Sequence, residues 1–304
     1  STIRDLALNN ATLTLAAPGA ANSLGNNKDI VIDTTAATIT NVSSNHADGT
    51  FTTNEIIDVT VTFTENVTVA SGTPQLTLDM DGTDRLAIYE SGSLSQILVF
   101  KYTVVASDNK TDLDYLATTA LNLNGATIRD NGGVNATLTL AAPAAANSLG
   151  ANKAINIDTT APTITNVSAS TADGTYSTGG IIDVTVTFSE NVTVATANPQ
   201  LTLELGTTDR LAEYNSGSLS QILTFKYTVQ SGDNSTDLDY VASTALNING
   251  ATIRDVVAQN ATLTLAAPAA ANSLGNNKAI VIDTTAPTIT NVSSAKADGT
   301  YKDA

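Results

Sequence analysis

The side chains in this sequence whose types and spacing suit chemistry are carboxylates. Asp108, Asp112 and Asp114 stand within seven residues of one another. The same three acids return one period later as Asp233, Asp237 and Asp239. Carboxylates held this close repel one another unless water or a cation separates them, and calcium accepts roughly six to eight such oxygens without strict geometry. We therefore predict a calcium-binding loop, with a solvated acidic loop as the alternative.

Other catalytic and metal chemistries lack the side chains they need. The sequence contains no Cys and one His, His46, which becomes Thr171 one period later. A Ser-His-Asp triad, a thiol nucleophile and a transition-metal site therefore cannot be assembled. Asp112 and Asp114 have the residue types of a glycosidase pair, but the absence of Trp and an aromatic content of 4% leave no sugar-stacking cleft. We predict that the protein is not an enzyme and has no catalytic residue.

A second acidic segment, Asp79 to Asp84 (DMDGTD), is similar to the opening of an EF-hand loop. Its counterpart, Glu204 to Asp209 (ELGTTD), has one carboxylate fewer and a different glycine spacing. Because the pattern is not shared between the copies, a solvated hairpin is the better interpretation.

The whole chain repeats with a period of 125 residues. Segment 30–42 (IVIDTTAATITNV) returns with few changes at 155–167 and 280–292. A unit of this length is a typical domain with its own hydrophobic core. The predicted boundaries are 1–33 for the last strands of a preceding repeat, 34–158 and 159–283 for two complete repeats, and 284–304 for the first strand of a following repeat.

Within a repeat, apolar residues alternate with polar ones as in strands with one buried face. Segment 56–63 (IIDVTVTF) shows the pattern clearly. The other expected strands are 38–42, 75–80, 85–90, 96–104, 120–129, 136–140 and 154–157. Short strands without helical periodicity predict an all-β fold, a tandem antiparallel β-sandwich of Greek-key type. Segment 141–149 (AAPAAANSL) fits either a loop or a helical turn.

Composition limits the possible partners. The formal net charge is −16, with 42% apolar and 14% charged residues, which is typical of a soluble folded chain. No run approaches the roughly 18 apolar residues of a membrane-spanning helix, so membrane insertion is not expected. Without a basic patch, nucleic acid is not an expected partner. An acidic surface suits solubility or divalent cations.

Strand direction brings acids from different loops toward the junction between repeats. In a sandwich of seven alternating strands, the loop after the second strand and the loop between the sixth and seventh lie at one end. That end would gather Asp158 from the joint with Glu190 and Asp255 from the repeat that follows. We therefore predict calcium at the joints, with the 108–114 loop as a further contributor. The candidate metal ligands are Asp33, Glu65, Asp108, Asp112, Asp114, Asp130, Asp158, Glu190, Asp233, Asp237, Asp239, Asp255 and Asp283.

The repeated motifs also carry a resemblance. DTTAPTITNVS, ADGTY, IIDVTVTFSENVTV, PQLTLELG, LTFKYTV, DLDY and GATIRD, in that order, resemble the bacterial immunoglobulin-like repeats of giant surface proteins and adhesins, including the calcium-rigidified extender regions of RTX-type adhesins. The resemblance covers the whole chain. It implies immunoglobulin-like domains in an elongated extracellular spacer of a secreted protein, and it brings no catalytic residue with it.

These observations together predict a non-enzymatic stalk or fibre segment of a bacterial cell-surface protein, with calcium-stiffened joints. The alternative is an adhesive module that binds a glycan or a partner cell surface, although near-identity of the repeats favours spacing over recognition. The expected partners are neighbouring repeats or copies of the same chain, head to tail, with any glycan or cell-surface ligand bound through the parent protein. Segments 1–33 and 284–304 would expose apolar faces unless the array continues or neighbouring chains complete them.

Overall fold

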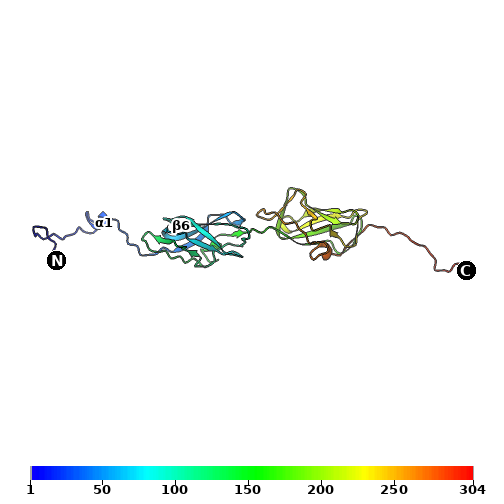
Figure 1. Ribbon diagram of the computed structural model, residues 1–304, viewed down its shortest axis with the longest axis horizontal. Coiled ribbons are helices and arrows are strands. Elements are labelled where there is room, and N and C mark those ends of the chain that lie inside the picture. The colour runs from blue at the N-terminus through cyan, green and yellow to red at the C-terminus, as the bar shows by residue number, and fades with distance from the viewer. Residues whose placement is uncertain (1, 304) are drawn as a thin grey trace. The chain divides into compact units, whose positions relative to one another are not determined.

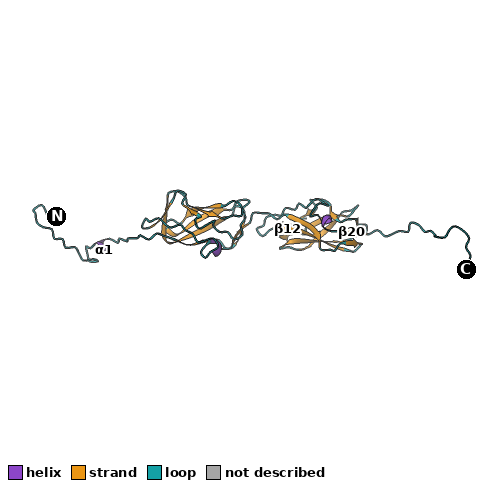
Figure 2. Ribbon diagram, turned by 90° about the horizontal axis from the view of Figure 1, so that it is seen from below, coloured by secondary structure: helices purple, strands orange, loops and turns teal. Residues whose placement is uncertain are grey.

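The computed structural model describes residues 2–303 and shows an all-β protein, whose strands and short helices are coloured in Figure 2. Residue contacts divide it into two compact units, the first ending at Ile157 and the second beginning at Asp158, with Thr50–Thr52 grouping with the second. Each unit is built on one curled antiparallel sheet. The prediction of two similar β-domains in tandem is confirmed (Figure 1).

The strands that precede Asp158 follow the alternation of the sequence. They are β1 (Ile39–Ser44), β2 (Gly49–Phe51), β3 (Ile56–Ala70), β4 (Gln75–Leu78), β5 (Arg85–Ser91), β6 (Ser95–Thr103), β7 (Leu121–Asn122), β8 (Thr127–Asp130) and β9 (Ile155–Ile157). The sheet order is β1-β3-β6-β5-β4-β7, and β8 pairs with β3. Ile57, Val59 and Val61 on β3 are fully buried, as the alternation predicts.

The second unit repeats this arrangement. Its strands are β10 (Ile164–Ala169), β11 (Gly174–Tyr176), β12 (Ile181–Ala195), β13 (Gln200–Glu204), β14 (Arg210–Ser216), β15 (Ser220–Thr228), β16 (Asn234–Ser235), β17 (Asp239–Tyr240), β18 (Leu246–Asn247), β19 (Thr252–Arg254) and β20 (Ile280–Asp283). The main sheet runs β10-β12-β15-β14-β13-β17, with β18 on β13 and β19 on β12. In a separate small sheet, β20 pairs in parallel with β11 and antiparallel with β16.

Strand β3 continues beyond the predicted end at Phe63, because a bulge lets the chain stay in the sheet. Thr62 pairs with Ile97 of β6, whereas Val67 pairs with Ser95, so the register shifts between them. After the bulge, β3 pairs with β8. The bulge therefore lies where two parts of the sheet meet, and it contains Glu65.

Two strand predictions need correction. Segment 120–129 divides into β7 and β8, because Asn124 and Gly125 both adopt positive φ in a turn. Segment 136–140 forms no strand, and within it Thr137 makes a single parallel bridge to Thr38. The N–H groups of this segment donate to separate parts of the chain, so a ladder cannot form. Its alternation records burial of one face without strand pairing.

Segment 141–149 resolves into turns that end in a short helix, α2 (Leu149–Asn152). Ser148 caps the helix by accepting the Ala151 N–H at 3.2 Å, and Leu149 is fully buried. The Asn152 side-chain amide then donates to the Val42 carbonyl at 2.7 Å, on edge strand β1. Helix α3 (Leu274–Asn277) places an Asn amide in the same way in the second unit. In each unit, an asparagine side chain thus hydrogen-bonds to a backbone carbonyl of the edge strand, β1 or β10.

The segment before β1 includes helix α1 (Leu24–Asn27), and many of its apolar side chains are exposed to solvent. Ile3 is 66% exposed, whereas its counterpart Ile128 is 2% exposed. Leu15 is 89% exposed and its counterpart Leu140 is 3% exposed. The same residue types are buried where the rest of a repeat surrounds them.

Candidate metal centres

Carboxylates from distant segments come together in each unit. In the first triad, Asp33, Glu65 and Asp130 offer ligand oxygens that all lie within 4.8 Å of one another. The second triad consists of Asp158, Glu190 and Asp255. The prediction that these three acids meet beside the joint is confirmed, and the period of the sequence reproduces the group in the first unit.

Asp255 is held by a tight turn after β19. The backbone N–H groups of Val257 and Gln259 donate to its Oδ1 at 2.9 and 2.8 Å. The residue is 4% exposed, and its Oδ2 is buried without a hydrogen-bond donor. A buried oxygen without a donor is costly, so this atom is a candidate ligand for a cation.

Asp130 has the same arrangement in the first unit. Its Oδ1 accepts the Val134 N–H at 2.9 Å, and its Oδ2 is buried without a donor. The turn residues differ between the units, reading NGGV at 131–134 and VVAQ at 256–259. The turn sequence changes, but both units keep a buried aspartate oxygen without a donor. The feature therefore depends on the aspartate and its place in the fold, not on one turn sequence.

The other two members come from the bulge and from the joint. Glu65 lies in the β3 bulge, and the Thr64 N–H donates to the Thr38 carbonyl at 2.9 Å, which ties the bulge to the chain that follows the joint. In the second unit, Asp158 Oδ1 accepts the Thr160 N–H at 3.0 Å. The Asp158 carbonyl accepts from the Gln259 side chain at 3.4 Å. The joint acid is therefore linked to the turn that holds Asp255.

Charge is concentrated in both triads. Burial, followed by the negative charges of Asp158 and Asp255, raises the pKa of Glu190 to about 7. The pKa of Glu65 is raised in the same way, by burial and by its acidic neighbours. Burial is also the main cause of the raised pKa of Asp255. The fold therefore holds these carboxylates together against their mutual repulsion.

The donor set fits a hard divalent cation. Each triad supplies only carboxylate oxygens, the ligands that calcium and magnesium prefer, and neither contains the nitrogen or sulfur ligands typical of zinc. Calcium tolerates the irregular geometry of side chains drawn from three separate segments, whereas magnesium requires a near-ideal octahedron. The triads can therefore hold a metal ion such as calcium.

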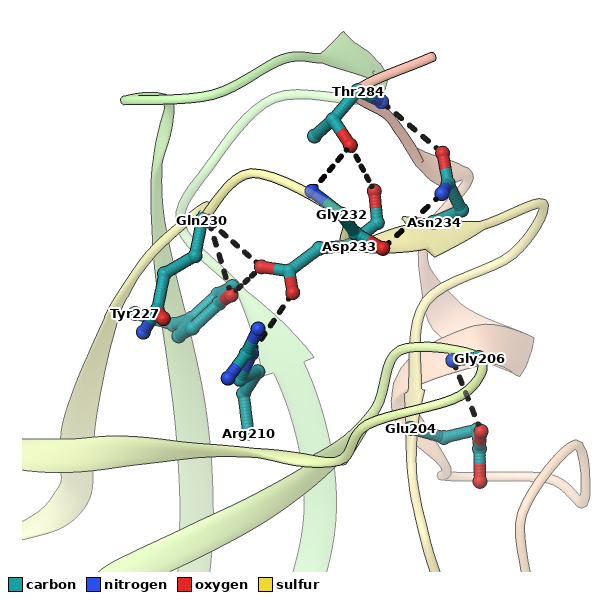
Figure 3. Close-up of polar contacts among 9 residues, drawn as sticks. All are labelled: Glu204, Gly206, Arg210, Tyr227, Gln230, Gly232, Asp233, Asn234 and Thr284. Atoms are coloured by element: carbon teal, nitrogen blue, oxygen red, sulfur yellow. Dashed lines mark hydrogen bonds and ion pairs between the residues drawn. The ribbon is translucent and has the colours of Figure 1, made fainter.

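Asp108 and Asp233, which we predicted as calcium ligands, accept hydrogen bonds from the protein itself. In the second unit, Asp233 is 1% exposed and accepts hydrogen bonds from Arg210 Nε at 2.9 Å, from the Gln230 N–H at 2.7 Å and from the Tyr227 hydroxyl (Figure 3). The matching donors to Asp108 are Arg85, Val105 and Tyr102. Protein donors thus occupy the oxygens that we predicted for calcium.

The remaining acids of that loop do not join a group of three ligands within residues 2–303. Asp239 accepts the backbone N–H groups of Tyr240 and Ala269 at 2.9 and 2.8 Å, and Asp114 has the equivalent bonds. Asp112 and Asp237 are exposed. The buried carboxylates of the loop therefore organise backbone turns.

Within residues 2–303, the Asp79–Asp84 hairpin and Asp283 lie outside both triads. Lys110 forms ion pairs with two acids of the Asp79–Asp84 hairpin. Its Nζ lies 2.7 Å from Asp79 and 3.5 Å from Asp81, so a lysine side chain neutralises part of the charge there. Asp283, the last of the predicted ligands, is exposed, and its Oδ1 accepts the Thr285 N–H at 2.9 Å. In the described part of the chain it belongs to no acidic triad.

Comparison with protein families and with curated proteins identified no relative of this chain. No family model matches the chain, and no curated protein matches it either. Within residues 2–303, no helix has the length and apolar character needed to cross a membrane. The structure shows a tandem of two similar antiparallel β-domains, each with an acidic triad that could hold a metal ion.

Proposed function

We propose that this chain is a segment of a non-enzymatic stalk whose joints are stiffened by calcium. The observation that carries the proposal is the recurrence of the acidic triad in both units, each with a buried carboxylate oxygen that lacks a donor. Each triad combines the aspartate of a joint with two acids of the repeat that follows. A cation bound there would tie the joint to that domain and cancel the repulsion among the acids.

The finer assignment follows the sequence motifs. We propose that the units are immunoglobulin-like Greek-key domains of a secreted, adhesin-like bacterial surface protein. Extracellular calcium modules bind at about 10⁻⁴ to 10⁻³ M, which matches the calcium available outside cells. An extracellular setting would therefore keep the triads filled, and near-identical repeats would serve to set length.

Calcium titration by calorimetry tests the metal sites. We expect two ions per chain, because there are two triads. Asp130→Asn and Asp255→Asn should each abolish one ion, since each removes the charge of a buried ligand. Asp112→Asn, in the exposed loop that does not join a triad, should leave both. Absence of binding, or loss of a site in Asp112→Asn, would contradict the proposal.

Small-angle scattering tests the stiffening. We expect EDTA to broaden the size distribution of the full chain, because emptied triads release the joint. Asp158→Ala combined with Glu190→Ala should reproduce much of that broadening in the presence of calcium, because it removes one of the two triads. Asp81→Ala, on the hairpin that pairs with Lys110, is the matched control and should not. Superimposable curves with calcium and with EDTA would remove calcium from the mechanism.

A further inference from the structure

The first residue after β20 is fixed to the loop between β15 and β16. The Thr284 hydroxyl donates to the Asp233 carbonyl at 2.9 Å and accepts the Gly232 N–H at 3.0 Å. The Thr284 N–H donates to Asn234 Oδ1 at 3.1 Å (Figure 3). Thr285 Oγ1 donates to the same amide oxygen at 3.1 Å. The exit of the chain is thus bonded at several points to one short loop.

That loop is itself anchored in the unit. The Asp233 carboxylate, bonded to Arg210, Tyr227 and the Gln230 N–H, fixes the residue whose carbonyl Thr284 binds. The Asn234 amide also donates to the Gly232 carbonyl at 3.3 Å, which closes the loop on itself. In Figure 3 the bonds form a continuous path from the Arg210 side chain to Thr284. A loop held this way offers a rigid anchor.

We infer that Thr284 is a positioning residue that fixes the direction in which the chain leaves the unit, without the help of a metal. The inference rests on the proposed stalk function, because an exit direction has a mechanical role only where a further domain follows. The triad acts on the following side of a joint, and the threonine acts on the preceding side. Both must hold for the joint to be stiff.

The sequence repeats the elements of this device at the joint between the two units. Asp108 and Asn109 stand 125 residues before Asp233 and Asn234, and Thr159 stands 125 residues before Thr284. Asp108 also has the same buried network of an arginine and a tyrosine. Because the sequence repeats these residue types, the experiment tests the same role at Thr159 as well as at Thr284.

The first arm measures amide hydrogen exchange by NMR in the full chain. Thr284→Val keeps the side-chain shape but removes the hydroxyl, so the Gly232 amide should exchange roughly five to ten times faster, as expected for the loss of one hydrogen bond. Thr284→Ser keeps the hydroxyl and should stay within about twofold of the natural protein. Exchange that is unchanged in Thr284→Val, or equally fast in both variants, overturns the inference.

The second arm measures the spread of distances between the units. Because the chain has no Cys, spin labels can be placed through Thr83→Cys and Thr208→Cys, at matching exposed positions. Thr159→Val should broaden the distance distribution in calcium, whereas Thr159→Ser should not. An unchanged distribution in Thr159→Val overturns the positioning role. If EDTA has no effect while the Val and Ser variants still differ, the calcium proposal fails and the threonine inference stands.

Discussion

We expect 10 mM calcium to raise the melting temperature of each unit by about 10 °C relative to EDTA. With a dissociation constant near 10⁻⁴ M, this concentration is a hundredfold excess, which stabilises the folded state by about 2.7 kcal/mol. For domains of this size, that free energy corresponds to a shift on the order of 10 °C. Differential scanning calorimetry of the full chain measures it, and coincident traces with calcium and with EDTA would contradict it.

A single variant in one triad makes this result sharper. At pH 8 the Glu190 carboxylate is ionised beside two other acids, since its pKa is about 7. Glu190→Gln keeps the shape and removes the repulsion, so the second unit should gain about 1 kcal/mol in EDTA, a value reduced to allow for solvent screening. In this variant the transition of the second unit should lose most of its response to calcium. The transition of the first unit, where Glu65 is intact, provides the internal control. A variant that melts lower in EDTA, or that keeps the full calcium shift, would refute this account of the triad.

The second large effect concerns the buried Asp233 network. Asp233→Ala leaves the Arg210 guanidinium and the Tyr227 hydroxyl without their acceptor. Breaking a buried ion pair costs about 3 to 5 kcal/mol, and the lower end applies because the Arg210 side chain is 26% exposed. We expect the transition of the second unit to fall by about 10 °C while that of the first unit stays in place. Calorimetry with calcium and with EDTA should give the same loss, because this aspartate lies outside both acidic triads.

Acid titration provides an independent check on the same residue. Burial alone would raise the pKa of Asp233, but hydrogen bonds from Tyr227 and Arg210 hold it below its ordinary value of 3.8. Because the folded-state pKa is the lower one, the stabilisation is present above about pH 4 and is lost as pH falls further. Asp233→Ala should therefore approach the natural protein in stability as the pH falls through the lowered pKa of Asp233. Asp237→Ala, at an exposed position, should differ little at any pH. If the loss of stability in Asp233→Ala depended on calcium, the loops 108–114 and 233–239 would again be candidate metal sites.

The second triad could be predicted from the sequence because it depends on strand order, which alternation and turn signals reveal. In the predicted strand order, Glu190 and Asp255 follow strands that end on the same side, and Asp158 marks the joint. The geometry that would let them hold a metal ion could not be predicted in the same way. It depends on the β3 and β12 bulges and on the buried oxygens of Asp130 and Asp255, which are consequences of packing.

The Asp108 prediction shows what local spacing omits. Three acids within seven residues indicate repulsion only if no cation comes from elsewhere, and here Arg85 reaches Asp108 across the sheet from 23 residues away. The sequence contains a signal, because Arg210 and Asp233 repeat the pair at the same separation. Recognising it requires the pairing of β14 with β15, which brings the arginine strand beside Tyr227.

The parallel pairing of β11 with β20 has a consequence for a chain under tension. Gly174 opposes Ile280 and Tyr176 opposes Ile282, so a strand near the start of the unit runs beside the strand at its end. When the two ends of the unit are pulled apart, such strands slide along each other, and their hydrogen bonds bear the load together instead of breaking one after another. Forced unfolding is set by the unfolding rate, so shear loading of this kind raises the force that a unit withstands without changing its equilibrium stability. Single-molecule pulling along the chain would measure that force directly.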